Sequence, residues 1–137
     1  MTAAVEARGE RSTRTLPAVA GAVSEARRWT ASVAGGMLGE DQAANLRLVI
    51  SELVTNALRH GADAADGQRI DLAVTPKPGF LCVQVTDDGP GLAPRPRALE
   101  TDDNGGFGLY FVEQLTRRWG VTRENRRTRV WFELDYR

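Results

Sequence analysis

The sequence lacks the features that mark membrane and secreted proteins. No apolar run approaches the roughly 20 residues needed to cross a bilayer, so no membrane-spanning segment is expected. Residues 1–14 alternate Ala, Glu, Arg, Ser and Thr without an apolar core, and so lack the hydrophobic region of a secretory signal. The sequence therefore predicts a cytoplasmic location and no membrane partner.

The sequence also has a single cysteine and no formal net charge. Cys82 is the only cysteine, so no internal disulfide can form, and its apolar neighbours favour a buried small side chain over a reactive thiol. The formal net charge is zero, which removes the overall electrostatic argument for binding nucleic acid. The segment from Arg117 to Arg129 is locally basic, and we interpret it as a solvated surface.

The length and composition that are present fit one folded domain. A chain of 137 residues is long enough to bury most of its apolar surface around a single core. Its apolar share of 42% and charged share of 26% are usual for a globular protein. We predict a flexible tail over residues 1–10 and one domain over residues 11–137.

Hydrophobic patterns predict both helices and strands. Helical spacing of apolar residues predicts helices over residues 17–33, 41–60 and 106–118, with Asp41 as the N-cap of the second. Two-residue alternation predicts strands over residues 11–16, 70–75, 80–86, 120–124 and 128–135, with turns at Pro76–Gly79 and Asn125–Arg126. This succession of helices and antiparallel strands favours a two-layer α+β sandwich.

A row of polar side chains borders the apolar stripe of the second predicted helix. Glu52, Asn56 and His60 are spaced four apart, so they form one slanting row. The Asn56 amide oxygen suits Mg²⁺, and the Glu52 carboxylate suits acceptance of a proton from an attacking hydroxyl. The alternative is an ordinary amphipathic helix with polar edge residues, in which His60 merely caps the C-terminus.

A carboxylate and two glycines follow the strand predicted over residues 80–86. Asp87 comes directly after an apolar strand, where its carboxylate suits a hydrogen bond from an adenine amino group. Gly89 and Gly91 allow a flat ring to approach the backbone closely. The alternative is a simple β-turn. Residues 89–105, rich in Pro, Gly and Asp, are predicted as a lid over a binding site.

A glycine cluster precedes the last predicted helix. Gly105, Gly106 and Gly108 have backbone amides that, with the helix N-terminus, suit phosphate oxygens. The cluster contains no G-K-[ST] sequence and does not follow a strand. It therefore disfavours both the lysine-containing phosphate loop and the dinucleotide fingerprint.

Together the three segments resemble the sequence boxes of one ATPase superfamily, shared by gyrase, histidine kinases and MutL. Glu52-x-x-x-Asn56-Ala57-x-x-His60 resembles the N box, Asp87-x-Gly89-x-Gly91 the G1 box, and Gly106-x-Gly108-Leu109 the G2 box. The short chain and the run from Gly105 to Glu113 are most similar to the anti-sigma-factor serine kinases of the RsbW and SpoIIAB type. The resemblance covers residues 11–135. It implies the Bergerat ATPase fold, with a mixed, mostly antiparallel sheet covered by helices on one face.

The resemblance implies ATP and Mg²⁺ as cofactors and a role for each matching residue. Asn56 would coordinate Mg²⁺, Glu52 would be the general base, and Asp87 would recognise adenine. Thr128 resembles, to within one residue of register, the strand threonine that assists Asp87. The other nucleotide-binding residues implied are His60, Gly89, Gly91, Gly105, Gly106, Gly108 and Leu109.

The resemblance also implies partners. Members of this type sequester a sigma factor and phosphorylate a serine of a STAS-domain antagonist. The resemblance implies the same function for this chain, which is expected to be a homodimer. Kinase members tend to have an arginine just before the G2 glycines, where this chain has Asp103 and Asn104. Without that cation, charge on the transferring phosphoryl group is stabilised less, unless Arg95 or Arg97 substitutes. Two alternatives therefore stay open: a nucleotide-gated binding module without phosphotransfer, and the detached ATP-binding domain of a histidine kinase.

Overall fold

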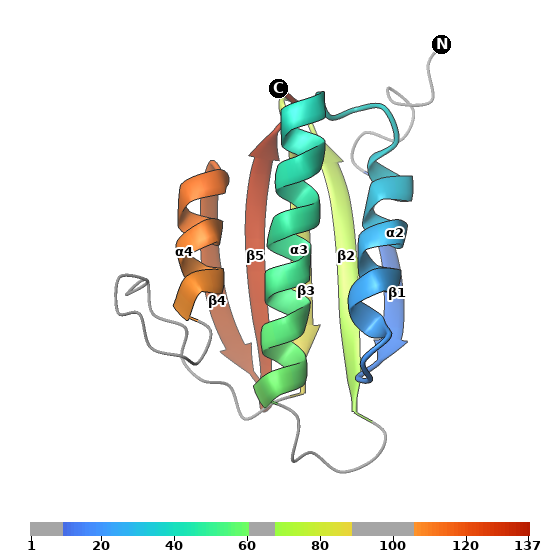
Figure 1. The fold of residues 1–137 in the computed structure, drawn as a ribbon, viewed down its shortest axis with the longest axis vertical. Helices are drawn as coiled ribbons and strands as arrows, with labels where there is room; N and C mark the ends of the chain where they lie inside the picture. Colours follow the sequence, from blue (N-terminus) through green and yellow to red (C-terminus); the bar gives the residue numbers. More distant parts are fainter. Residues whose placement is uncertain (1–9, 61–67, 89–105) are drawn as a thin grey trace.

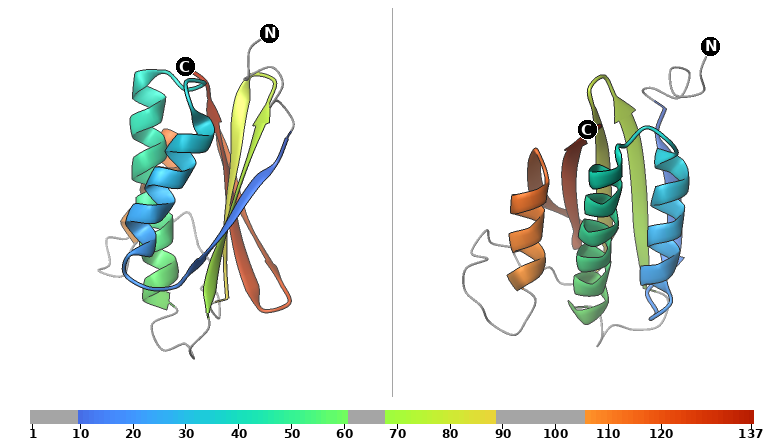
Figure 2. Two further views of the ribbon diagram at one scale, coloured as in Figure 1. Left: turned by 90° about the vertical axis from the view of Figure 1, so that its right-hand side faces the viewer. Right: turned by 45° about the horizontal axis from the view of Figure 1, so that its top comes forward.

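The computed structural model of the protein describes residues 10–60, 68–88 and 106–137, which form a layer of helices and one sheet. The elements in chain order are β1 (Ser12–Pro17), α2 (Ala22–Ala34), α3 (Glu40–His60), β2 (Arg69–Lys77), β3 (Phe80–Asp87), α4 (Gly106–Leu115), β4 (Arg118–Glu124) and β5 (Arg127–Asp135). Figure 1 shows the helices in front of the sheet, and the edge-on view in Figure 2 shows two separate layers. The predicted two-layer α+β sandwich is confirmed.

The strands form one sheet in the order β1-β2-β3-β5-β4. All the strand pairs in the described ranges are antiparallel, whereas a mixed, mostly antiparallel sheet was expected. Pro78 and Gly79 alone connect β2 to β3, and Gly79 has a φ of 90°. Asn125 and Arg126 connect β4 to β5 with φ values of 52° and 68°. Positive φ at both central residues suits the twist of a two-residue hairpin, which fixes the register of its strands.

The core lies between the helices and the sheet face that they cover, which we call the inner face. On β3 and β5 the buried inner-face residues are Leu81, Val83, Val85, Val130, Phe132 and Leu134. α3 packs against both strands with a stripe that comprises Leu46, Val49, Ile50, Leu53, Val54 and Ala57. Spacings of three and four place this stripe on one side of the helix. α3 therefore anchors the helix layer over the centre of the sheet.

The opposite face of the sheet, which we call the outer face, carries no helix from the described residues (Figure 2). Cys82 lies on it, half-buried rather than fully buried as the sequence predicted. Burial, together with the nearby negative charge of Glu133, raises the pKa of the Cys82 thiol. A raised pKa favours the unreactive thiol form, in agreement with the absence of a predicted role for this residue.

The start of the first helix was predicted wrongly. Pro17 ends β1 opposite Arg69, and α2 begins only at Ala22. The spacing of Val19 fits the apolar stripe of the helix predicted over residues 17–33, but this residue lies before α2 with 56% of its surface exposed. The Val19 amide donates to the Pro17 carbonyl at 2.8 Å, which makes a turn between strand and helix.

Three smaller boundaries also differ. α3 begins at Glu40, so Asp41 is its second residue and not its N-cap. α4 ends at Leu115, and two residues later the Arg117 amide donates to a β5 carbonyl at 2.8 Å, which carries the chain into β4 instead of a longer helix. Pro76 continues β2 instead of opening the turn. β1 pairs only as far as Val74, so a missing amide at Pro76 costs no hydrogen bond on that side.

Two predicted segments lie outside the described residues, namely the tail, apart from residue 10, and the lid over residues 89–105. Among the helices of the described ranges, none combines the length and apolar character needed to cross a bilayer.

Candidate functional site

Segments that are far apart in the sequence meet at one end of the sheet. Figure 1 places the C-terminal ends of α3 and β3 beside the start of β5 at the lower end of the molecule, and α4 starts from the same side. β3 pairs with β5, and α3 packs against both strands and against α4. The fold therefore gathers the predicted N box, the predicted adenine-reading residues and the start of the G2 box.

Asp87 and Thr128 lie directly opposite each other at the ends of β3 and β5. Because strand side chains alternate, the buried Val85 and Val130 two residues away place this pair on the inner face. Thr128 is only 4% exposed, and its Oγ1 finds no hydrogen-bond partner within the described ranges. A buried hydroxyl without a partner costs about 1–3 kcal/mol. This oxygen is therefore a candidate for contact with a bound ligand.

Glu52 and Asn56 occupy the edge of the buried stripe of α3. Both side chains are partly buried, and their neighbours Leu53 and Ala57 belong to the core. Mg²⁺ is usually held by a few protein oxygens together with phosphate oxygens and water, a part that the Asn56 amide oxygen fits. His60 is the last residue of α3, but its side chain lies outside what the structure describes.

The glycine cluster is only partly within the described residues. Gly106 is the first residue of α4, and Gly108 and Leu109 follow in its first turn. The free amides of a helix N-terminus suit anionic oxygens, and this one faces the end of the sheet where Asp87 lies (Figure 1). The remaining predicted glycines, Gly89, Gly91 and Gly105, lie outside the described residues.

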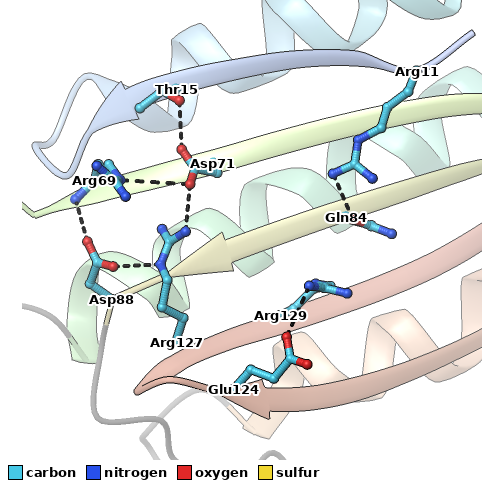
Figure 3. A network of polar contacts seen from close by, with 9 residues as sticks. All are labelled: Arg11, Thr15, Arg69, Asp71, Gln84, Asp88, Glu124, Arg127 and Arg129. Atoms are coloured by element: carbon cyan, nitrogen blue, oxygen red, sulfur yellow. Dashed lines mark hydrogen bonds and ion pairs between the residues drawn. The ribbon is translucent and has the colours of Figure 1, made fainter.

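A polar network that the sequence did not reveal lies on the outer face at the same end of the sheet (Figure 3). The Arg127 guanidinium donates through Nε to Asp88 and through Nη1 to Asp71, each at 2.7 Å. Asp88 also accepts the backbone N–H of Arg69 at 3.2 Å, and Asp71 accepts the Thr15 hydroxyl at 2.7 Å. The network thus joins β1, β2, β5 and the residue that follows β3.

Opposite charges hold this network ionised. Burial alone raises the pKa of Asp71, but hydrogen bonds from Thr15 and Arg127 and the charges of Arg127 and Arg69 bring that pKa below its ordinary value. Burial lowers the pKa of Arg127, whereas its hydrogen bonds and charge interactions with Asp71 and Asp88 raise it above its ordinary value. The Asp71 carboxylate and the Arg127 guanidinium therefore stay charged near neutral pH.

The helices and the antiparallel sheet define a two-layer α+β domain, with the candidate site at the end of the sheet where α3 and β3 end. A histidine kinase-like ATPase domain model matches residues 16–134, and the chain belongs to this family. The superfamily indicated by the three sequence boxes is thereby confirmed.

Similar proteins cover different shares of the chain. The sensor histidine kinase PdtaS of Mycobacterium tuberculosis is 40% identical over 82 residues, which are 58% of this chain and 16% of PdtaS. The structure of the RsbU and RsbW domains of Rv1364c from Mycobacterium tuberculosis matches 91% of this chain and 32% of that chain, with a TM-score of 0.65 and 21% identity. The SiaB–SiaC complex from Pseudomonas aeruginosa matches 95% of this chain and 92% of that chain, with a TM-score of 0.56 and 12% identity. At these identities the two structural likenesses establish the fold.

Proposed function

We propose that this chain binds ATP with Mg²⁺ and acts as an anti-sigma factor with serine kinase activity. Membership of the histidine kinase-like ATPase family supports nucleotide binding. The observation that carries the proposal is the buried Thr128 hydroxyl opposite Asp87, which has no hydrogen-bond partner among the described residues. Fold likeness to a structure that contains an RsbW domain favours the anti-sigma role over other roles of the family.

Each residue near the site has a specific part in nucleotide binding. The Asp87 carboxylate accepts a hydrogen bond from the adenine amino group, and the Thr128 hydroxyl completes the polar contacts to the ring. The Asn56 amide oxygen serves as a magnesium ligand. His60, Leu109 and the glycines of the two boxes shape the rest of the site.

Phosphotransfer requires a base and a serine hydroxyl in line with the γ-phosphorus. Glu52 accepts the proton of that hydroxyl as its oxygen bonds to phosphorus and the bond from phosphorus to the ADP oxygen breaks. Mg²⁺ held through Asn56 would neutralise charge on the phosphates. A positioned general base of this kind contributes about 10²–10⁴-fold to the rate.

The proposal includes specific partners. The protein sequesters a sigma factor, and phosphorylation of a serine on a STAS-domain antagonist ends the ability of the antagonist to compete for it. We place this exchange in the cytoplasm and assign it to a homodimer.

Nucleotide binding is tested by calorimetry with Mg·ATP. The wild-type protein is expected to bind, and Asp87→Asn is expected to bind at least about tenfold more weakly, because it removes a charge-assisted hydrogen bond. Asp41→Asn is the control, since Asp41 lies in the first turn of α3, away from the C-terminal end of that helix. No binding by the wild-type protein would refute the proposal.

Phosphotransfer is tested by mixing the protein with Mg·ATP and candidate STAS-domain antagonists, with phosphoserine detected by mass spectrometry. Glu52→Gln should slow the reaction by about 10²–10⁴-fold and leave ATP affinity nearly unchanged. Glu113→Gln, an exposed position on α4, should react like the wild type. If Glu52→Gln regulates its partner normally, the protein is a nucleotide-gated binding module without phosphotransfer.

The similarity to PdtaS supports a second candidate, the ATP-binding domain of a histidine kinase. In that case the phosphoryl group would appear on a histidine of a separate or neighbouring domain. Phosphohistidine is labile in acid and phosphoserine is not, so acid treatment of the labelled products separates the two candidates.

A further inference from the structure

We infer that Arg127 and Asp88 form a clamp on the outer face that positions Asp87 and Thr128 on the inner face for adenine binding. This inference rests on the proposed ATP site, to which it adds two positioning residues that do not touch the nucleotide. The clamp is the ion pair between Arg127 and Asp88, 2.7 Å apart.

The clamp residues are the direct chain neighbours of the two proposed adenine contacts. Asp88 follows Asp87, and Arg127 precedes Thr128. Successive side chains along an extended chain point to opposite faces, so each pair of neighbours sends one side chain to each face of the sheet. Asp87 and Thr128 are opposite each other in the ladder. An ion pair between their neighbours on the outer face therefore restrains the backbone at both positions.

The position of Asp88 depends on side-chain bonds. β3 ends at Asp87, so the backbone ladder holds the chain no further than that residue. Beyond it, the Asp88 carboxylate is attached at two points, to Arg127 and to the backbone N–H of Arg69 on β2. These two bonds fix the position of Asp88, and therefore the orientation of its neighbour Asp87.

Arg127 is itself anchored by a second carboxylate. Its Nη1 donates to Asp71 at 2.7 Å, and the Thr15 hydroxyl holds the other oxygen of Asp71 (Figure 3). The side chains of Arg127, Asp88 and Asp71 are 26%, 27% and 31% exposed, so solvent screens these bonds only in part. Loss of the guanidinium would leave Asp88 without its ion pair and Asp71 with the longer pair to Arg69, 3.8 Å away, and Asp88 would move away from Asp71.

The test compares nucleotide affinities of Arg127→Gln and Asp88→Asn with those of the wild type by calorimetry, using Mg·ATP and Mg·GTP. Each variant should bind ATP about tenfold more weakly, the low end for groups that orient a binding residue from behind. The preference for ATP over GTP should fall by a similar factor, because Asp87 would no longer be aligned with the amino group. General destabilisation alone would not alter this ratio in folded protein.

Arg129→Gln is the matched control. Arg129 is the next outward-facing arginine on β5, and its ion pair with Glu124 is longer, at 3.7 Å. It should keep the affinity and the preference of the wild type. Arg127→Lys provides a second variant, which keeps a cation between Asp88 and Asp71 and should retain more of the preference than Arg127→Gln. Circular dichroism at the assay temperature confirms that each variant is folded.

The outcomes distinguish the clamp from the function on which it rests. If both Arg127→Gln and Asp88→Asn keep the ATP affinity of the wild type and its preference for ATP over GTP, the clamp is overturned and the ATP site stays intact. An equal loss in Arg129→Gln would also overturn it, because the effect would then reflect general charge. If the wild-type protein binds no adenine nucleotide, the proposed function and the clamp fail together. If Arg127→Gln does not fold, Asp88→Asn and Arg127→Lys decide, and wild-type preference in Asp88→Asn counts against the clamp.

Discussion

The two faces of the sheet stabilise the same strands by different means. On the inner face, Val83, Val85 and Phe132 are buried against the helices, with no more than 2% of each exposed. On the outer face, the neighbouring positions on these strands carry polar side chains. Gln84, for example, takes part in a hydrogen bond and Arg127 in an ion pair. Apolar burial therefore fixes the strands over their length, and charge pairs fix the ends where the proposed site lies.

The largest expected effect is on the inner face, where Phe132→Ala removes a ring that has no exposed surface. The free energy of unfolding should fall by about 3–5 kcal/mol, since the substitution leaves a cavity in the core. Urea denaturation followed by circular dichroism measures this change. Thr122→Ala, at an exposed outward position on β4, should stay within about 0.5 kcal/mol of the wild type. Equal losses at the two positions would contradict the difference between the faces.

On the outer face, the indole of Trp131 packs closely against Gly120. A Cβ added at Gly120 would lie 2.6 Å from Trp131 Cζ2, so the ring must move. Gly120→Ala should therefore reduce stability by about 1–3 kcal/mol and change tryptophan fluorescence. Gly21→Ala is the control, because a Cβ at Gly21 meets nothing within 4 Å. An unchanged unfolding midpoint in Gly120→Ala would show that the outer face tolerates added volume even here.

Thr128→Val separates ligand binding from stability. Within the part of the chain that the structure describes, the Thr128 hydroxyl is buried without a partner, so valine should leave the free energy of unfolding unchanged or raise it by up to about 1 kcal/mol. ATP affinity should nevertheless fall several-fold, since the ring would lose a polar contact. Calorimetry and thermal unfolding measure the two quantities, with the outward-facing Thr122→Val as control. A loss of stability with normal ATP affinity would show that the hydroxyl serves the fold instead of the ligand.

The smallest expected effect concerns acid stability. The folded-state pKa of Asp71 lies below its ordinary value of 3.8, so the unfolded state binds this proton more readily than the folded state. The resulting stabilisation is present above about pH 4 and is lost as the pH falls through the folded-state pKa. Asp71→Asn should flatten the decline of stability in this range, and Thr15→Val, which removes one hydrogen bond to Asp71, should flatten it in part. Urea midpoints measured from pH 5 to pH 2.5 test this, and a slope unchanged in Asp71→Asn would contradict it.

Local sequence patterns located most elements to within a few residues. The predicted start of α3 is only one residue from the observed start. This helix was located well because a long apolar stripe marks it and Gly61 marks its end. The Asn125–Arg126 turn was also found, since adjacent alternating strands leave only these residues to reverse the chain. Val19 was misassigned, because its spacing fits the helical stripe and only the turn after Pro17 keeps it outside.

The candidate site was predictable in its residue types but not in its arrangement. Glu52, Asn56 and Asp87 carry recognisable chemistry at recognisable spacing. The alignment of Thr128 with Asp87 was uncertain by one residue in the sequence, because the pairing of β3 with β5 depends on contacts across 41 positions of the chain. A shift of one residue would send the Thr128 side chain to the outer face, so only the sheet register decides whether it belongs to the site.

The sequence by itself determined the periodicity of the strands and helices, the three boxes and hence the family of the protein. These properties depend on neighbours within a few positions, where propensity and side-chain spacing act directly. Only the tertiary structure decided that Arg127 bridges Asp88 and Asp71, 39 and 56 positions away. An ion pair at such separations leaves no periodic trace in the sequence, since β2, β3 and β5 must first come together in one sheet before the charges meet.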